Sequence, residues 1–162
     1  MKIKLIDNDY SYYNKGYKSM YEIYVHGKPY TECEEYHLKK ELIVSGLDNG
    51  RGFRNMKDLN DYYLFLDKIY TDMKANGYKT QQELGNYTED EIGVFISTSG
   101  DVIKAEDNMG GSHRFAMARI LGIKYIPVII EGIHNSVFSE YSKNYISNPR
   151  SIVKKFIEKL ED

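Results

Sequence analysis

The chain has 162 residues and a mass of 18.9 kDa, a length that favours one domain able to bury its own core. Hydrophobic residues make up 41 % of the chain and charged residues 28 %, which excludes collagen-like and largely disordered proteins. The net charge of −2 argues against a protein that coats nucleic acid through bulk charge. The single cysteine, Cys33, cannot form an internal disulfide, and no long apolar run is present, so we expect a cytoplasmic protein without a membrane segment.

Residues 1–56 carry the weakest patterns and receive no family or domain assignment. The alternation in Tyr21–Val25 predicts a strand, because side chains of a strand point to opposite faces in turn. A turn is expected at His26–Pro29, and a short helix at Glu34–Ile43.

The pattern becomes clear from Asp58 onward. Apolar and aromatic residues recur at three- and four-residue spacing up to Gly77, which predicts an amphipathic helix that this glycine ends. Ile92–Ile96 predicts a buried strand, and a hairpin turn at Ser99–Asp101 leads into a second strand over Val102–Ala105.

A second helix is expected after the glycine pair Gly110-Gly111. Ser112 is its predicted N-cap, Gly122 ends it, and its apolar face would hold Phe115, Ala118 and Leu121. A buried strand over Tyr125–Ile130 follows. Asn148-Pro149 then predicts the start of an amphipathic helix over residues 148–162, which packs on the domain or, alternatively, binds a partner.

The segment from Glu106 to Arg114 leaves a strand, crosses the glycine pair and enters a helix. Free N–H groups and the helix dipole favour an anion at such a helix start, and an arginine there can hold a phosphate in two places. The alternative is that the glycines make only a tight turn, with Arg114 paired to a carboxylate.

The sequence Gly110-Gly111-Ser112-His113-Arg114-Phe115-Ala116-Met117-Ala118, with Ile120-Leu121-Gly122 and Tyr125-Ile126-Pro127-Val128 after it, resembles the superfamily of ParB N-terminal domains and sulfiredoxins. The resemblance covers about residues 90–134. It implies that the helix start binds the phosphates of a nucleoside di- or triphosphate such as ATP, ADP or CTP, through Gly110, Gly111, Ser112, His113 and Arg114. Ser112 stands where sulfiredoxins have their nucleophilic cysteine, which argues against sulfinic acid repair.

A kinase of free serine also uses this fold, with acidic residues near the nucleotide. The resemblance therefore suggests Asp107, and less strongly Glu106, as a general base or Mg²⁺ ligand; the alternative is a pair of solvated loop carboxylates. His134 follows the strand at Tyr125–Ile130 and is a further catalytic candidate if it reaches the same cleft; otherwise it is structural or exposed.

Arg51-Gly52-Phe53-Arg54 places two arginines around a flexible residue and an aromatic ring. Arg51 and Arg54 are candidates to clamp a phosphate, and the alternative is a solvated turn before the following helix.

Together these features predict a single α/β domain over residues 1–162, of the ParB/sulfiredoxin type, with a small mixed sheet covered by helices. The function we expect is nucleotide binding, with a phosphotransferase (a kinase) or nucleotide hydrolase acting on a small acceptor and using Mg²⁺. The alternatives are a non-enzymatic module that binds a nucleotide or nucleic acid, and a ParB-like nuclease.

Overall fold

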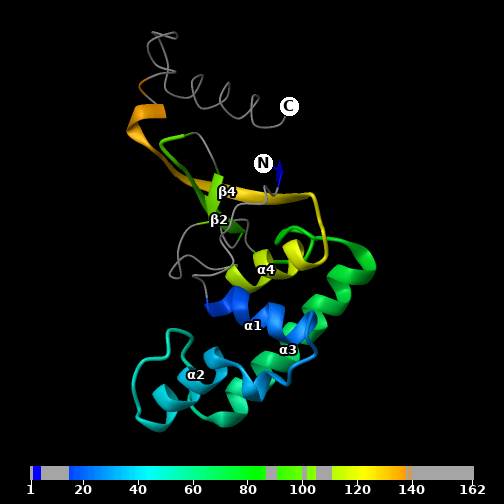
Figure 1. Cartoon of the computed structure of the whole chain (residues 1–162), viewed down its shortest axis with the longest axis vertical. Coiled ribbons are helices and arrows are strands. Elements are labelled where there is room, and N and C mark those ends of the chain that lie inside the picture. Colours follow the sequence, from blue (N-terminus) through cyan, green and yellow to red (C-terminus); the bar gives the residue numbers. More distant parts are fainter. Residues whose placement is uncertain are drawn as a thin grey trace. The chain divides into compact units, whose positions relative to one another are not determined.

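The computed structural model describes residues 2–4, 15–86, 91–99, 102–104, 111–137 and 139. These residues form helices and one small mixed sheet, so the predicted α/β class is confirmed (Figure 1). The helices are α1 (Lys15–Tyr24), a 3-10 turn at Tyr30–Glu32, α2 (Glu34–Val44), α3 (Met56–Asn76) and α4 (Ser112–Ile120). The strands are β1 (Lys2–Lys4), β2 (Ile92–Ile96), β3 (Val102–Lys104) and β4 (Tyr125–Ile133).

Two further sequence predictions concern the C-terminal helix and membrane-spanning segments. The C-terminal helix expected over residues 148–162 lies outside the described residues. Among the helices that are described, none is both long enough and apolar enough to cross a membrane.

The chain divides into two compact units. One contains the strands and comprises Met1–Asn8, Lys79–Gly111 and Ile123–Asp162. The other contains α1 to α4 and comprises Asp9–Tyr78 and Ser112–Gly122.

The strands of the first unit lie in the order β1-β4-β2-β3. β2 and β4 are parallel, whereas β1 is antiparallel to β4 and β3 is antiparallel to β2. The predicted β2 and its antiparallel neighbour β3 are therefore confirmed, while Gly100 and Asp101 of the predicted turn lie outside the described residues.

β4 differs from the uniformly buried strand expected from its apolar run. It extends to Ile133, and within its first half only Ile126 and Val128 are buried, while Tyr125 is 53 % exposed. Because side chains of a strand alternate between its two faces, an apolar run does not by itself place both faces in a core.

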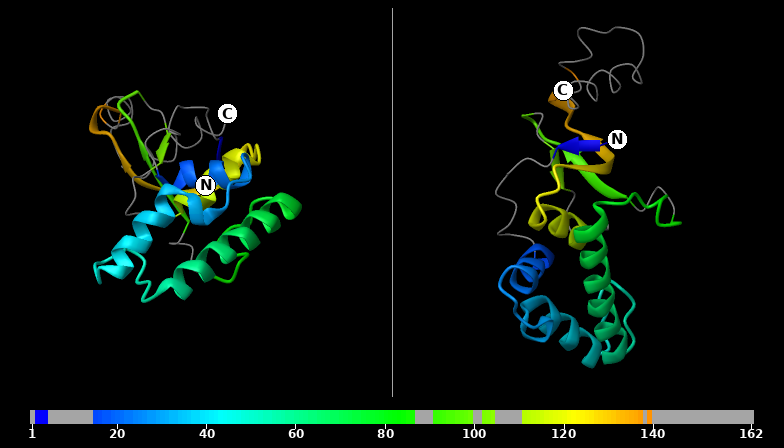
Figure 2. Two further views of the ribbon diagram at one scale, coloured as in Figure 1. Left: turned by 60° about the horizontal axis from the view of Figure 1, so that its bottom comes forward. Right: turned by 90° about the vertical axis from the view of Figure 1, so that its right-hand side faces the viewer.

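The four helices of the second unit pack in a ring. α1 contacts α2, α2 contacts α3, α3 contacts α4, and α4 contacts α1 (Figure 2). The buried hydrophobic side chains of this unit include sulfur-containing, aromatic and aliphatic residues: Met20, Cys33, Tyr36, Leu59, Tyr63, Leu66, Met73, Ala116, Met117 and Ala118.

The longest helix, α3, agrees with its prediction apart from its start. It begins at Met56, two residues before Asp58, because the Asn55 side chain accepts a hydrogen bond of 3.0 Å from the Asp58 N–H and so caps the first turn. At the other end the Gly77 N–H donates to the Met73 carbonyl at 2.9 Å, as expected for a terminating glycine. α2 likewise covers the predicted span and continues to Val44.

The strand predicted at Tyr21–Val25 is wrong, because Tyr21 to Tyr24 form the last turn of α1. A strand would put Tyr21, Ile23 and Val25 on one face, but Tyr21 and Val25 are exposed while Ile23 is half-buried. Five residues are too short a window to separate a strand from a helix. The turn expected at His26–Pro29 does follow the helix.

The buried face of α4 also differs from its prediction. Ala118 is buried as expected, but Phe115 and Leu121 are only half-buried. His113 and Arg114 are buried in their place, 4 % and 8 % exposed. Polar side chains are rarely buried without hydrogen-bond partners, so the surroundings of His113 and Arg114 are candidates for a functional site.

Candidate functional site

A cluster of polar side chains lies inside the helical unit around His113 of α4. Its Nε2 atom lies 2.9 Å from Glu35 Oε2 of α2. Its Nδ1 atom lies 2.8 Å from the hydroxyl of Tyr62 on α3, and 3.2 Å from a guanidinium nitrogen of Arg51. Both ring nitrogens are therefore engaged within the unit. We refer to Glu35, Arg51, Tyr62 and His113 as the His113 cluster.

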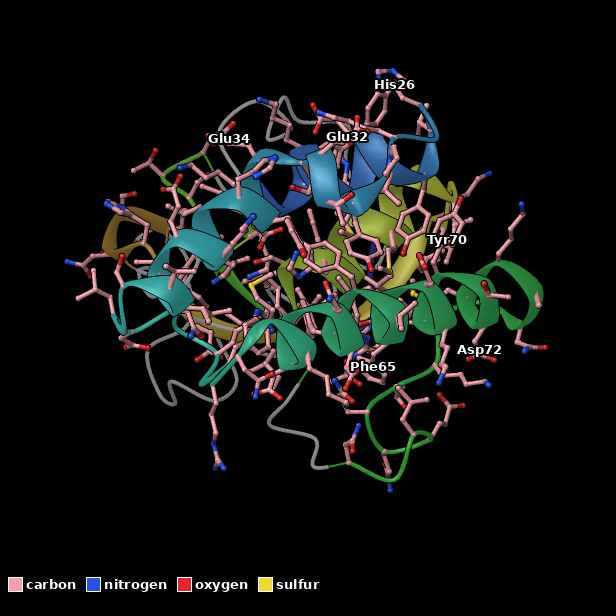
Figure 3. All side chains as sticks on the ribbon, turned by 90° about the horizontal axis from the view of Figure 1, so that it is seen from below. His26, Glu32, Glu34, Phe65, Tyr70 and Asp72 are labelled. Atoms are coloured by element: carbon pink, nitrogen blue, oxygen red, sulfur yellow. The ribbon has the colours of Figure 1, made fainter. Side chains whose placement is uncertain are left out.

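Helix geometry explains why Glu35 rather than its neighbour enters the His113 cluster. Successive side chains of an α-helix point about 100° apart. Glu34 therefore faces outward, where its half-exposed carboxylate pairs with Lys15 and Lys18 (Figure 3). Glu35 faces the helical ring and is 9 % exposed.

The loop between α2 and α3 positions Arg51. Asn49 is 5 % exposed, and its side-chain oxygen accepts hydrogen bonds from the N–H groups of Arg51 at 3.2 Å and Phe53 at 3.0 Å. Lys39 adds a bond of 2.7 Å to the Asn49 carbonyl. The Arg51 guanidinium then lies 4.5 Å from the centre of the Tyr62 ring, a cation–π contact. Arg51 as a whole residue is exposed.

Burial and hydrogen bonds fix the charges in the cluster. Burial alone would raise the pKa of Glu35. The hydrogen bond from His113, the charge of that ring when it is protonated, and the cations Lys39 and Arg51 together lower this pKa below its ordinary value. Burial raises the pKa of Tyr62, and it does the same for Tyr63, whose hydroxyl lies 3.5 Å from Glu35 Oε2. At pH 7 the Glu35 carboxyl group is therefore ionised, and the phenols of Tyr62 and of the neighbouring Tyr63 are neutral.

The lowered pKa of Glu35 predicts a specific loss of stability in acid. A carboxyl group whose pKa is lower in the folded chain stabilises the fold above its ordinary value of 4.5, and this contribution is lost as the pH falls through the folded-state pKa. We expect the free energy of unfolding of the wild type to fall relative to that of Glu35→Gln as the pH drops below about 4.5. Denaturant titrations of both chains between neutral pH and pH 3 measure this difference, and parallel curves would contradict it.

The structure brings together two of the residues predicted as phosphate ligands, Arg51 and His113, which are 62 positions apart in the sequence. Arg54 is exposed, and its backbone N–H donates to Asp58 Oδ2 at 2.8 Å at the start of α3. Arg114 is buried with its guanidinium 4.5 Å from the centre of the Tyr78 ring. Ser112 is the first residue of α4 and is half-buried, one position from its predicted place as N-cap.

Gly111 and His134 do not lie side by side. A Cβ atom on Gly111 would come within 2.8 Å of Ile92, the first residue of β2. The His134 N–H instead donates to the carbonyl of Ile96, the last residue of β2. Four residue steps of a strand span about 13 Å, so these two candidates lie near opposite ends of β2.

His134 has a local structural role where it lies. Its Nδ1 atom accepts the Ser136 N–H at 3.2 Å and lies 2.8 Å from the Ser136 hydroxyl. This side chain caps the helical turn that begins at Asn135.

The acidic candidates Glu106 and Asp107, and the first glycine of the pair, Gly110, lie outside the described residues. Within the described ranges, no group of three or more His, Cys, Asp or Glu side chains could hold a metal ion.

Glu35 and Tyr62 were missed as site residues at the sequence level. Tyr62 was assigned only to the apolar face of α3, although a buried tyrosine hydroxyl normally finds a hydrogen-bond partner. Glu35 carries no such signal, because it is one of two adjacent glutamates at the start of a helix. Neither residue could be linked to His113 from sequence, because they are separated from it by 78 and 51 positions.

A depression of about 460 Å³ also lies along the second half of α3. Its lining contains two carboxylates and one ammonium group, a balance that does not favour a phosphate. The lining residues are Asp67, Lys68, Thr71, Asp72, Ala75 and Asn76.

Comparison of the chain with family models, curated proteins and solved structures finds no significant match. The resemblance to ParB N-terminal domains and sulfiredoxins accordingly remains a prediction, and the His113 cluster has to be interpreted from its own geometry.

Proposed function

We propose that this protein binds the phosphate groups of a nucleoside di- or triphosphate, with Arg51 as the cation that contacts them. One observation carries this proposal: the guanidinium of Arg51 lies 3.2 Å from His113, in a loop that leaves Arg51 exposed. Two residue types suited to phosphate thus converge from separate parts of the sequence. The fork of N–H donors on an arginine matches a phosphate in two places.

Because of Tyr62, the Arg51 guanidinium can bind a ligand without leaving His113 Nδ1 without a hydrogen-bond partner. The Tyr62 hydroxyl lies nearer to His113 Nδ1 than the guanidinium does, at 2.8 Å against 3.2 Å. Nδ1 keeps a partner when the guanidinium turns to an anion. Arg114, Ser112 and the backbone at Gly111 are further proposed phosphate contacts, on the strength of the resemblance alone.

Beyond binding, we propose phosphoryl transfer to a small acceptor or to water, in the cytoplasm. His113 has a carboxylate on one nitrogen and a hydroxyl on the other, the arrangement that general acid–base catalysis uses. Mg²⁺ would supply charge neutralisation on the phosphates, with Asp107 as its proposed ligand. A non-enzymatic nucleotide-binding module is the competing function and is separated from an enzyme by turnover.

The test measures binding of ATP, ADP and CTP by calorimetry and thermal shift, with and without Mg²⁺. We expect Arg51→Ala to weaken binding about 10- to 100-fold, because hydrogen bonds to charged groups contribute about 1.5–3 kcal/mol. The nucleotide affinity of Arg51→Lys should lie between that of the wild type and that of Arg51→Ala, since an ammonium group keeps the charge but lacks the planar fork of donors.

Lys74→Ala provides the matched control. It removes an exposed cation from the last turn of α3, about 18 Å along the helix from Tyr62, and should leave affinity unchanged. Arg54→Ala decides whether the proposed clamp uses both arginines. The proposal is overturned if none of the nucleotides binds the wild type, or if Arg51→Ala binds them as tightly as the wild type does.

A further inference from the structure

Three groups of the His113 cluster form a continuous hydrogen-bonded chain. The Tyr62 hydroxyl lies 2.8 Å from His113 Nδ1, and His113 Nε2 lies 2.9 Å from Glu35 Oε2. The three side chains come from three helices, α3, α4 and α2. A hydroxyl, an imidazole and a carboxylate in hydrogen-bond sequence are the arrangement by which enzymes move a proton off an oxygen.

The hydrogen-bond partners assign the proton positions in this chain. Glu35 is ionised at neutral pH and can only accept, so Nε2 of a neutral His113 carries the ring proton. Nδ1 is then the acceptor, and the Tyr62 hydroxyl is the donor that points at it. The lone pair that would take a proton is therefore already directed at the phenol.

Tyr62 differs from the tyrosines Tyr24 and Tyr36 of the helical unit in the group to which its hydroxyl is bonded. Tyr24 and Tyr36 donate to the Asp67 carboxylate and the Asn60 amide oxygen, each at 2.9 Å, and neither acceptor belongs to the His113 cluster. Tyr62 instead meets an imidazole, and its half-buried ring carries the Arg51 guanidinium on its face. The Tyr62 hydroxyl and the Arg51 guanidinium therefore both lie against His113 Nδ1.

We infer that Tyr62 relays a proton from the acceptor of phosphoryl transfer to His113, an inference that rests on the proposed function. The acceptor hydroxyl, or water, gives its proton to Tyr62 Oη as Tyr62 gives its own proton to His113 Nδ1. The acceptor oxygen forms a bond to the terminal phosphorus, and the bond from phosphorus to the leaving nucleotide oxygen breaks. The imidazolium, held by Glu35, afterwards returns its proton through Tyr62 to solvent.

The same contacts could serve stability alone, so the test separates the two roles. Tyr62→Phe keeps the ring under Arg51 and removes only the hydroxyl. We expect turnover to fall about 10²- to 10⁴-fold, the usual contribution of general acid–base catalysis, with nucleotide affinity within about threefold of the wild type. Tyr36→Phe is the control, because it also removes a hydroxyl bonded between α2 and α3 but outside the chain to His113.

A purely structural Tyr62 would not change the pH dependence of turnover. The relay passes a proton from Tyr62 to His113 Nδ1, so the pH profile of turnover should differ between the wild type and Tyr62→Phe. Nitrogen-15 NMR of the wild-type imidazoles adds a measurement that requires no variant to fold. It should find His113 protonated at Nε2 and unprotonated at Nδ1 at neutral pH.

The outcomes distinguish this inference from the function on which it rests. Absence of nucleotide binding by the wild type would overturn both. Nucleotide binding without turnover, wild-type turnover in Tyr62→Phe, or a His113 proton on Nδ1 would overturn the relay and leave nucleotide binding in place. A slow Tyr62→Phe beside a normal Tyr36→Phe supports the relay.

Discussion

Glu35→Ala should lower the free energy of unfolding by about 3–5 kcal/mol, a large part of the roughly 5–15 kcal/mol that a domain has. The substitution removes the acceptor of His113 Nε2 and leaves that N–H buried on a side chain that is 4 % exposed. It also removes the acceptor near the Tyr63 hydroxyl, which is itself buried. Denaturant titration at pH 7 measures the loss.

Glu34→Ala is the matched control for this substitution. Both glutamates lie in the first turn of α2 and interact alike with the helix dipole. Glu34 is exposed, and its pairs with Lys15 and Lys18 lie in water, so its removal should change stability little. Equal losses for Glu34→Ala and Glu35→Ala would show that the dipole, and not His113, accounts for the effect.

The parts of the fold that sequence predicted well are those whose signals are local. α3 could be placed because its apolar and aromatic residues repeat over about four turns and a glycine follows the helix. β2 and β3 could be placed because a short apolar run and a turn signal lie next to each other. α1 could not, since the alternation in Tyr21–Val25 fits a strand as well as the end of a helix.

The candidate site was only partly predictable because its partners come together through packing. Arg51 and His113 were each predicted to bind phosphate from their own neighbours in the sequence. In the folded chain the Arg51 guanidinium lies 3.2 Å from His113 Nδ1. Glu35 has no local signal that connects it to a histidine 78 positions later. His134 also depends on packing, because its position after a strand does not by itself say that it lies at the end of β2 opposite to Gly111.

The second large effect is expected at Gly111, in the segment that the sequence assigned to phosphate. Gly111 has a φ of +81°, a left-handed conformation that costs a residue with a Cβ atom about 1–2 kcal/mol. An added Cβ would also lie 2.8 Å from Ile92 Cγ1, at a residue that is 0 % exposed. Overpacking of this kind costs a further 1–3 kcal/mol or so, and Gly111→Ala should therefore destabilise the chain by about 2–5 kcal/mol.

Gly122→Ala separates the two contributions and tests why the glycine is needed. Gly122 follows α4 with a φ of +67°, but nothing lies within 4 Å of an added Cβ, so its substitution should cost only the conformational strain, about 1–2 kcal/mol. Both variants are measured by denaturant titration without nucleotide, and a larger loss for Gly111→Ala isolates the contact with Ile92. If Gly111→Ala is instead as stable as the wild type but binds nucleotide more weakly, the glycine serves the approach of a ligand and not the packing of β2. A loss of stability without ligand means that the fold alone requires Gly111, and the case for phosphate binding then depends on Arg51.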